Sequence, residues 1–194
     1  MQSSVAEQKE KLRTEALARR DALSPEARAA AAEAIAARAL PIAPQAGTIV
    51  SGFMPIRSEI NPLPLLRRYA EAGAGLALPR IVGRGRPLSM RAWSIGAPLI
   101  KGQWNIREPD PAAREVEPDI VLVPLAAFDR RGHRIGYGAG YYDRTIQSLR
   151  EKKPVTTIGI AFAVQEFDEV PALSHDERLD LVLTEREVID CRGA

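Results

Sequence analysis

The sequence predicts a three-layer α/β fold, in which a mostly parallel β-sheet carries helices on both faces and two N-terminal helices pack on it. Short apolar runs bounded by glycine or proline recur between residues 48 and 183, as expected for buried strands. Helical segments alternate with several of these runs, which favours βαβ units and parallel pairing. The chain has 194 residues, of which 45% are hydrophobic and 27% charged, so we expect one folded domain over residues 1–194.

The first forty residues are predicted to form two helices. Apolar side chains recur near helical spacing in residues 5–23, and glycine and proline are absent from that segment. Ser24 is suited to cap a second helix that has Pro25 at its first position. An alanine-rich run continues this helix to Leu40, and prolines then end it.

The central sheet is predicted from the rest of the chain. In chain order, we expect a strand at residues 48–54, a helix at 62–72, strands at 75–79, 88–94 and 120–125, a helix at 141–150, and strands at 155–163 and 179–183. Ligands of parallel sheets bind at the carboxyl ends of the strands. The loops after Met54, Leu125 and Ala163 are therefore the expected places for a binding site.

Composition narrows the class of ligand. The net charge of +2 and the aromatic content of 5% argue against a nucleic-acid surface and suit a small anion such as a polyphosphate. Cys191 is the one cysteine, and the chain contains no Cys/His cluster for zinc. No segment is apolar enough to act as a signal core or to span a bilayer. We expect a cytoplasmic protein that binds neither nucleic acid nor membrane.

Three glycines at alternate positions, Gly136, Gly138 and Gly140, lie between a predicted buried strand and a predicted helix. Glycine lets backbone N–H groups approach an anion, and the helix N-terminus adds partial positive charge. The segment is not a Walker A loop, because no Gly-Lys-Ser/Thr follows, and Tyr141 stands where the dinucleotide fingerprint has its third glycine. Taken alone, the glycines fit a ligand site and a ligand-free turn about equally.

The residues that follow the glycines favour a ligand. Tyr141 and Tyr142 can stack on a ring, and Asp143 can hold a metal ion or stabilise the helix N-terminus. Together with Phe128-Asp129, Gly132 and Arg134, the block resembles the signature of the 5-formyltetrahydrofolate cyclo-ligase family, also called methenyltetrahydrofolate synthetases. The likeness extends along nearly the whole chain. Further matching positions are Lys9, Arg13, Glu59-Ile60, Leu78-Pro79-Arg80, Trp104-Asn105-Ile106, Glu108-Pro109, Ala161-Phe162, Gln165, Pro171, His175-Asp176 and Asp180.

The resemblance implies three sets of site residues in an ATP-dependent ligase. ATP as co-substrate would contact Lys9, Arg13, Arg134, Ile135, Gly136, Tyr137, Gly138, Ala139, Gly140, Tyr141 and Tyr142. The reduced folate would contact Met54, Glu59, Trp104, Tyr137, Gly138, Ala139, Gly140 and Tyr141. Mg²⁺ would lie at Asp143 and Asp176. The implied reaction closes 5-formyltetrahydrofolate to 5,10-methenyltetrahydrofolate and releases ADP and phosphate. We expect the protein to be a monomer.

The residues alone leave other interpretations open. By spacing, Lys9 and Arg13 fit a solvated helix face, and Asp176 fits a solvated loop. Ordinary core packing is the commoner role of residues such as Met54 and Trp104. Glu59 could be an acid at the start of the helix that follows.

One position departs from the family. Tyr137 stands where the family very often has arginine, and a phenol offers one donor to phosphate where a guanidinium offers several. This substitution keeps open a non-catalytic folate-binding member of the family. A small-molecule kinase that uses the same glycine segment is the other alternative.

Overall fold

The computed structural model describes residues 4–40 and 43–193. Its centre is a seven-stranded sheet in the order β11-β10-β9-β6-β1-β2-β3. Neighbouring strands from β10 to β2 pair in parallel, and only the two edge strands, β3 and β11, are antiparallel to their neighbours. The strands are β1 (Ile49–Ser51), β2 (Gly75–Arg80), β3 (Ser89–Trp93), β6 (Ile120–Pro124), β9 (Thr156–Ile160), β10 (Leu181–Leu183) and β11 (Val188–Asp190).

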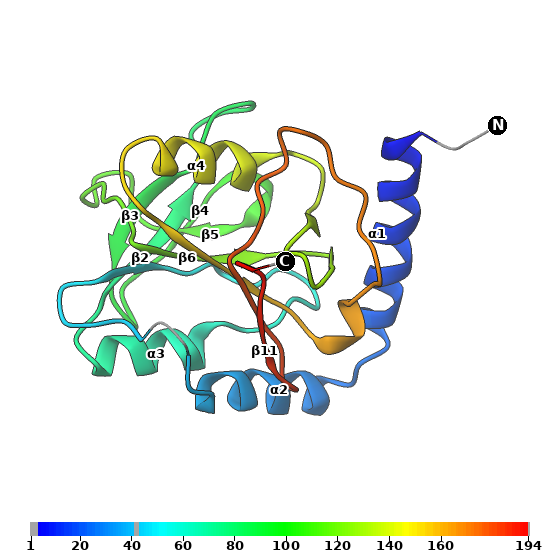
Figure 1. Cartoon of the computed structure of the whole chain (residues 1–194). Coiled ribbons are helices and arrows are strands. Elements are labelled where there is room, and N and C mark those ends of the chain that lie inside the picture. Colours follow the sequence, from blue (N-terminus) through cyan, green and yellow to red (C-terminus); the bar gives the residue numbers. More distant parts are fainter. Residues whose placement is uncertain (1–3, 41–42, 194) are drawn as a thin grey trace.

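Helices cover both faces of the sheet, so the predicted three layers are confirmed (Figure 1). Helices α2 (Pro25–Ala37) and α3 (Leu63–Glu71) lie on one face, and α4 (Tyr141–Arg150) lies on the other. Successive side chains along β6 point to opposite faces of the sheet, so they belong to two different core clusters. Leu122 packs in the cluster that contains α2 and α3, whereas Val121 and Val123 pack in the cluster under α4.

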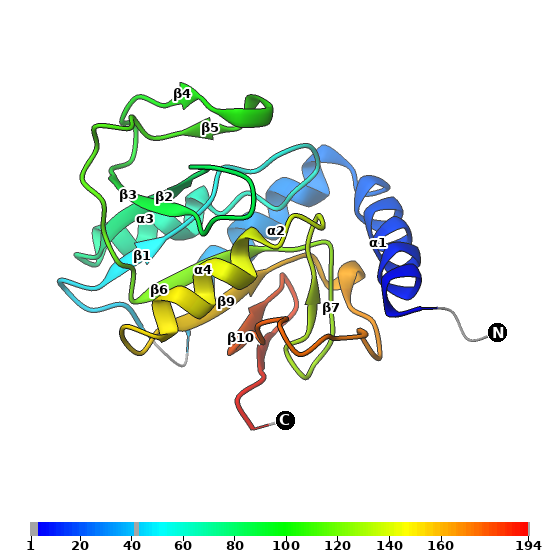
Figure 2. The same cartoon turned by 90° about the horizontal axis from the view of Figure 1, so that it is seen from above.

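Helix α1 (Val5–Asp21) has a different position from α2. It begins with a capping box, in which Ser4 Oγ accepts from the Glu7 N–H (3.2 Å) and the Glu7 carboxylate accepts from the Ser4 N–H (2.7 Å). The helix stands at one end of the molecule rather than on a sheet face (Figure 2). Its Ala16 packs with Ile135 and Val170, in a small core of its own. The prediction that both N-terminal helices pack on the sheet is therefore correct for α2 and wrong for α1.

The structure also contains short elements that the sequence did not predict, of which only some lie beside α1. Strands β7 (Ala127–Phe128) and β8 (Arg134–Ile135) form one hairpin, and β4 (Ile100–Lys101) and β5 (Arg107–Glu108) form another. Short 3₁₀ turns lie at Gln103–Asn105 and Ala163–Gln165. The β4–β5 hairpin extends beyond the sheet (Figure 2).

Most predicted elements are present with shifted ends. The second helix ends at Ala37, short of the predicted Leu40, and the first strand ends at Ser51, short of Met54. The predicted Ser24 cap is confirmed, since its Oγ accepts from the Ala27 N–H at 3.1 Å. In the described part of the chain, no helix is long and apolar enough to cross a membrane.

Candidate functional site

A cavity of about 930 Å³ opens at the carboxyl ends of the parallel strands. Met54 lines it beyond β1, Pro79 lies near the end of β2, and Pro124 ends β6. The loops after Met54 and Leu125, in which the sequence analysis expected a binding site, therefore both contribute residues to this cavity. The chain after Ala163 also contributes to the cavity, through Leu173, His175 and Asp176. Its first residues, 163–167, do not line the cavity and instead pack beside α1, where Arg19 lies over the Phe167 ring.

Every residue that the sequence suggested for a binding site lines this one cavity. They are Lys9, Arg13, Met54, Glu59, Trp104, Arg134, Ile135, Gly136, Tyr137, Gly138, Ala139, Gly140, Tyr141, Tyr142, Asp143 and Asp176. Residues from α1, from three strand-end loops and from the chain near Asp176 thus meet although they are far apart in sequence. The side chain of Ile135 packs in the core beside Ala16, so this residue is also part of the scaffold.

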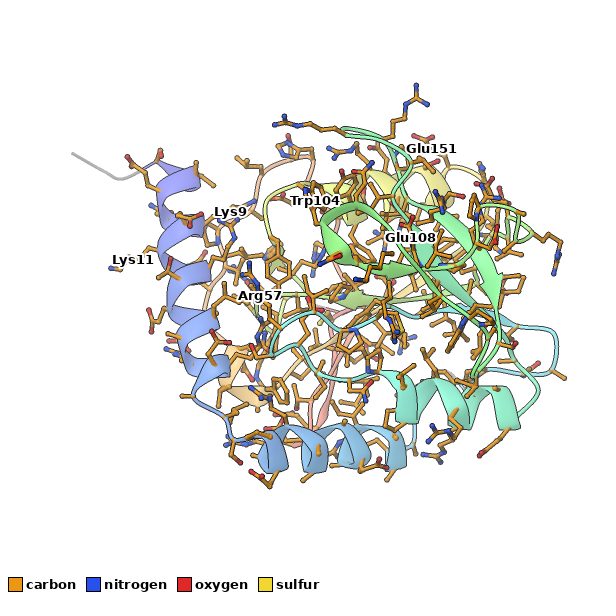
Figure 3. The ribbon with its side chains drawn as sticks, turned by 180° about the vertical axis from the view of Figure 1, so that it is seen from behind. Lys9, Lys11, Arg57, Trp104, Glu108 and Glu151 are labelled. Carbon is orange, nitrogen blue, oxygen red and sulfur yellow. The ribbon has the colours of Figure 1, made fainter. Side chains whose placement is uncertain are left out.

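Cations from α1 form one end of the cavity. Lys9 points from the helix toward the body of the protein, whereas Lys11 points away from it (Figure 3). The Lys9 ammonium contacts the Asp176 carboxylate. Arg13 donates from Nε to the Gly136 carbonyl at 2.8 Å, so α1 is tied directly to the glycine segment. The solvated-face interpretation of these two cations is wrong, since both side chains are mostly buried.

Arg134 and Asp143 form an ion pair in the wall of the cavity. Arg134 Nη2 lies 2.7 Å from Asp143 Oδ1, and the Arg134 side chain is only 4% exposed. The same Oδ1 atom accepts from the Glu177 N–H at 3.1 Å. The residue before Glu177 is Asp176, so the pair holds the chain segment that carries the second candidate carboxylate.

The glycine segment connects β8 to α4 through two residues in the left-handed region. Gly138 has φ +92° and Gly140 has φ +65°, values that residues with a Cβ adopt only with strain. Gly140 is the N-cap of α4 and provides no side-chain cap. The amino end of α4 therefore faces the cavity with its first N–H groups uncapped by a side chain, which is the arrangement that binds anions at helix N-termini.

An aromatic pair borders the cavity at the β4–β5 hairpin. The rings of Trp104 and Tyr141 lie 5.9 Å apart between centroids. Trp104 is 66% exposed and has φ +54°, so core packing is not its role. Figure 3 shows it on the hairpin, with Glu108 nearby at the hairpin base. Glu108 is buried, and its Oε1 lies 3.1 Å from Arg80 Nη1. This ion pair anchors the hairpin to β2.

Glu59 faces the cavity from the loop after β1. Its Oε2 accepts from the Ile56 N–H at 2.9 Å. Burial raises the pKa of this carboxyl above its ordinary value, although the Ile56 N–H, the Tyr137 hydroxyl and the charge of Arg20 act against the rise. Apolar side chains around it, including Phe53, make this end of the cavity suited to a flat ring with polar edges.

The carboxylates of Asp143 and Asp176 suit a Mg²⁺ ion that is also coordinated by substrate phosphates. Among residues 4–40 and 43–193, no group of three or more His, Cys, Asp or Glu side chains could hold a metal on its own. Mg²⁺ commonly uses one or two carboxylates, waters and substrate phosphates. Asp143 and Asp176 provide that number, and burial of Asp176 is outweighed by hydrogen bonds from Lys9 and Leu173, which lower its pKa and keep it ionised.

Sequence reasoning missed Arg20, the buried cation of α1. Arg20 is 1% exposed and donates to the hydroxyl of Tyr137 at 2.7 Å. A signal was available, because Lys9, Arg13, Ala16 and Arg20 are spaced by four, three and four residues and so lie on one helix face.

These features define an α/β protein whose cavity at the carboxyl ends of the strands is cationic and glycine-lined at one end and apolar with a carboxylate at the other. Comparison with known proteins gives the family. A sequence model of the 5-formyltetrahydrofolate cyclo-ligase family matches residues 5–185. The 5-formyltetrahydrofolate cyclo-ligase of Mycolicibacterium smegmatis is 36% identical over 74% of this chain and 76% of its own length. That of Escherichia coli K12 is 30% identical over 88% of this chain and 96% of its own.

Solved structures agree with the sequence relatives. The 5,10-methenyltetrahydrofolate synthetase of Aquifex aeolicus superposes with a TM-score of 0.76 at 29% identity, covering 96% of this chain and 94% of the other. The Mycoplasma pneumoniae 5,10-methenyltetrahydrofolate synthetase has the same fold, with a TM-score of 0.70 at 22% identity over 91% and 98% of the two chains. The chain belongs to the 5-formyltetrahydrofolate cyclo-ligase family.

Proposed function

We propose that this chain catalyses the ATP-dependent cyclisation of 5-formyltetrahydrofolate to 5,10-methenyltetrahydrofolate, with release of ADP and phosphate. One observation carries the proposal beyond family membership. A single cavity joins the cationic, glycine-lined end at Lys9, Arg13 and Arg134 to the apolar end at Glu59 and Trp104. Two substrates that must react with one another need such a continuous space.

In this proposal the nucleotide phosphates lie at the amino end of α4. Arg13 and Lys9 approach from α1, Arg134 from β8, and the backbone of residues 136–140 lies between them. Because the site combines the first helix with residues near Asp176, we propose that the chain acts as a single catalytic domain. Mg²⁺ at Asp143 and Asp176 would offset charge on the phosphates when bound.

The folate is proposed to occupy the other end of the cavity. The Glu59 carboxylate would accept hydrogen bonds from the amino and ring N–H groups of the pterin. Trp104 and Tyr141 would form flat walls at the junction with the nucleotide. Met54 adds apolar contact area from the loop after β1.

The chemistry asks the protein for positioning and charge neutralisation. A formamide oxygen is a poor leaving group, so it first attacks the γ-phosphorus, and ADP leaves. The N10 nitrogen then attacks the formyl carbon. The C–O bond breaks, and phosphate departs with the formyl oxygen while N10 loses its proton. Cations around the phosphates stabilise the charge that develops in both displacements.

The test is direct. Purified protein is mixed with 5-formyltetrahydrofolate and Mg²⁺, ATP is added, and the methenyl chromophore is followed. Product is expected only when ATP and Mg²⁺ are both present. Asp143→Asn is expected to lower turnover about a hundredfold or more, because the proposed contact between Asp143 and Mg²⁺ would stabilise the transition state. Binding of the folate without ATP-dependent product would instead identify a folate-binding module, and ATP hydrolysis without the folate product would identify a kinase-like activity.

A further inference from the structure

Arg20 is a buried cation for which the structure shows no carboxylate partner. The residue is 1% exposed, and no described carboxylate lies within ion-pair distance of its guanidinium. Its Nε donates to Ser58 Oγ at 2.9 Å and its Nη1 donates to the Tyr137 hydroxyl at 2.7 Å. Ser58 in turn donates to the Asp21 carboxylate. Buried charges are retained where they are hydrogen-bonded, and here the bonds lead to two loops of the cavity.

Tyr137 is the link between Arg20 and Glu59. Its hydroxyl oxygen accepts from Arg20 Nη1 at 2.7 Å, so its own proton remains available for an acceptor. Tyr137 and Glu59 line the same cavity, and the Glu59 carboxylate is the acceptor that influences the pKa of Tyr137. Burial raises the pKa of Tyr137 to about 12, so the group stays a neutral donor at physiological pH. The phenol is therefore directed toward the carboxylate end of the cavity, and not toward a phosphate.

Several groups act on the Glu59 carboxylate. Tyr137 and Arg20 favour its ionised form, as does Arg57, and burial opposes them. Tyr142 also faces it, as a neutral phenol whose own pKa is raised, first by burial and then by the Glu59 charge. Without the hydroxyl of Tyr137, Glu59 would keep the Ile56 N–H as a donor but lose the phenol that Arg20 holds.

We infer that Arg20 and Tyr137 are positioning residues that hold the Glu59 carboxylate in the orientation in which it accepts hydrogen bonds from the folate substrate. This inference rests on the proposed function. It also gives Tyr137 a role in recognition of the folate, with the phosphates left to Lys9, Arg13 and Arg134. The departure from arginine at this position then leaves nucleotide binding intact.

Tyr137→Phe tests the inference, because it removes the hydroxyl and keeps the ring. The KM for 5-formyltetrahydrofolate is expected to rise about tenfold, equivalent to about 1.4 kcal/mol. The KM for ATP is expected to change less than about twofold. The pH below which the folate KM rises is expected to move upward, because the ionised form of Glu59 has lost a hydrogen bond.

Tyr69→Phe is the matched control. Tyr69 is a buried tyrosine of α3 whose hydroxyl has no hydrogen-bond partner in the described part of the chain, and it does not line the cavity. Its kinetics are expected to equal those of the parent protein. Arg20→Lys keeps the charge with fewer donors, and we expect a smaller rise in the folate KM than in Tyr137→Phe.

Two results would overturn the inference: an unchanged folate KM in Tyr137→Phe, or a rise in the KM for ATP in place of the folate KM. If the parent protein forms no methenyl product, the proposed function fails separately. Calorimetric titration with 5-formyltetrahydrofolate then tests the inference by itself. A Kd that is the same in the parent and in Tyr137→Phe would overturn it, and a weaker Kd in Tyr137→Phe would support it.

Discussion

Asp129 holds the turn between β7 and β8, and replacing it with asparagine should destabilise the protein strongly. The side chain is fully buried. Oδ1 accepts from the N–H groups of Arg131 (2.9 Å) and His133 (3.1 Å). Oδ2 accepts from the Val170 N–H (3.0 Å), faces the His133 ring at 3.1 Å and lies 3.2 Å from Arg131 Nη2. The carboxylate thus organises the strand pair that carries Arg134.

The magnitude follows from these contacts. In Asp129→Asn the amide oxygen can replace one carboxylate oxygen. The NH₂ group then takes the place of the other oxygen and faces N–H groups that have no acceptor there. A buried donor such as the Val170 N–H that loses its acceptor costs about 1–3 kcal/mol. With the weakened contacts to His133 and Arg131 we expect about 2–4 kcal/mol in all. For a chain of this size that corresponds to a fall in Tm of roughly 5–15 °C.

The loss should depend on pH in a defined direction. Burial alone would raise the pKa of Asp129, but the hydrogen bonds from Val170 and His133 outweigh it and lower that pKa. A depressed folded-state pKa contributes stability above the unfolded value and loses it as the pH falls through the folded value. The difference in Tm should therefore be complete at neutral pH and shrink below about pH 4.

Thermal melting of both proteins across this pH range is the assay. Asp168→Asn is the control, because Asp168 is exposed, and it should melt within about 0.5 kcal/mol of the parent. A Tm equal to that of the parent, or a deficit that stays constant from neutral pH into acid, would refute the reasoning.

Three further predictions concern the cavity and the thiol. Trp104→Ala should raise the KM for the folate roughly threefold to tenfold, since an aromatic contact is worth about 1 kcal/mol, and should leave Tm unchanged because the ring is exposed. Steady-state kinetics with a melting curve measures both, and a lower Tm would contradict the exposed placement. Gly138→Ala should raise the KM for ATP about tenfold, because φ +92° strains a residue that has a Cβ. An ATP titration measures this, and unchanged ATP kinetics would contradict it. Burial raises the pKa of Cys191 to about 11, so a disulfide reagent should react with it only in denaturant, and rapid labelling of the native protein would contradict its burial.

The large elements of the fold could be predicted because their patterns are long. Continuous apolar runs such as Ile120–Pro124 indicate strands buried on both faces, and helix α4 was predicted with its observed bounds. Hydrophobicity misled where apolar residues leave the sheet. Phe53 and Met54 extend the apolar run of β1, but both line the cavity beyond the end of the strand, and Phe53 also packs in the core against α2 and α3.

The short hairpins could not be predicted. Strands of two residues, such as β7 and β8, are too short to show a period of two, and they exist because tertiary contacts hold them. Asp129 is one such contact, joining residues that are 41 positions apart in sequence at Val170. A single sequence does not report contacts of this kind.

The candidate site was predicted as a set of residues, but its internal connections were not. The sequence motif around Gly140 led to a set of candidate residues that line one cavity in the structure. It did not indicate that Tyr137 would contact a buried arginine from α1, because Arg20 resembles an ordinary cation in the last turn of a helix.

The contact between Lys9 and Asp176 joins residues that are 167 positions apart in sequence. Proteins are synthesised from the N-terminus, so the first helix is made long before the segment with which it forms the cavity. A nascent chain lacks the complete cavity until Asp176 has left the ribosome. Neither substrate can stabilise the growing chain at this site, because a ligand stabilises only a state that it binds. Earlier folding must rely on the core around the parallel strands, and the capacity to bind is acquired late in synthesis.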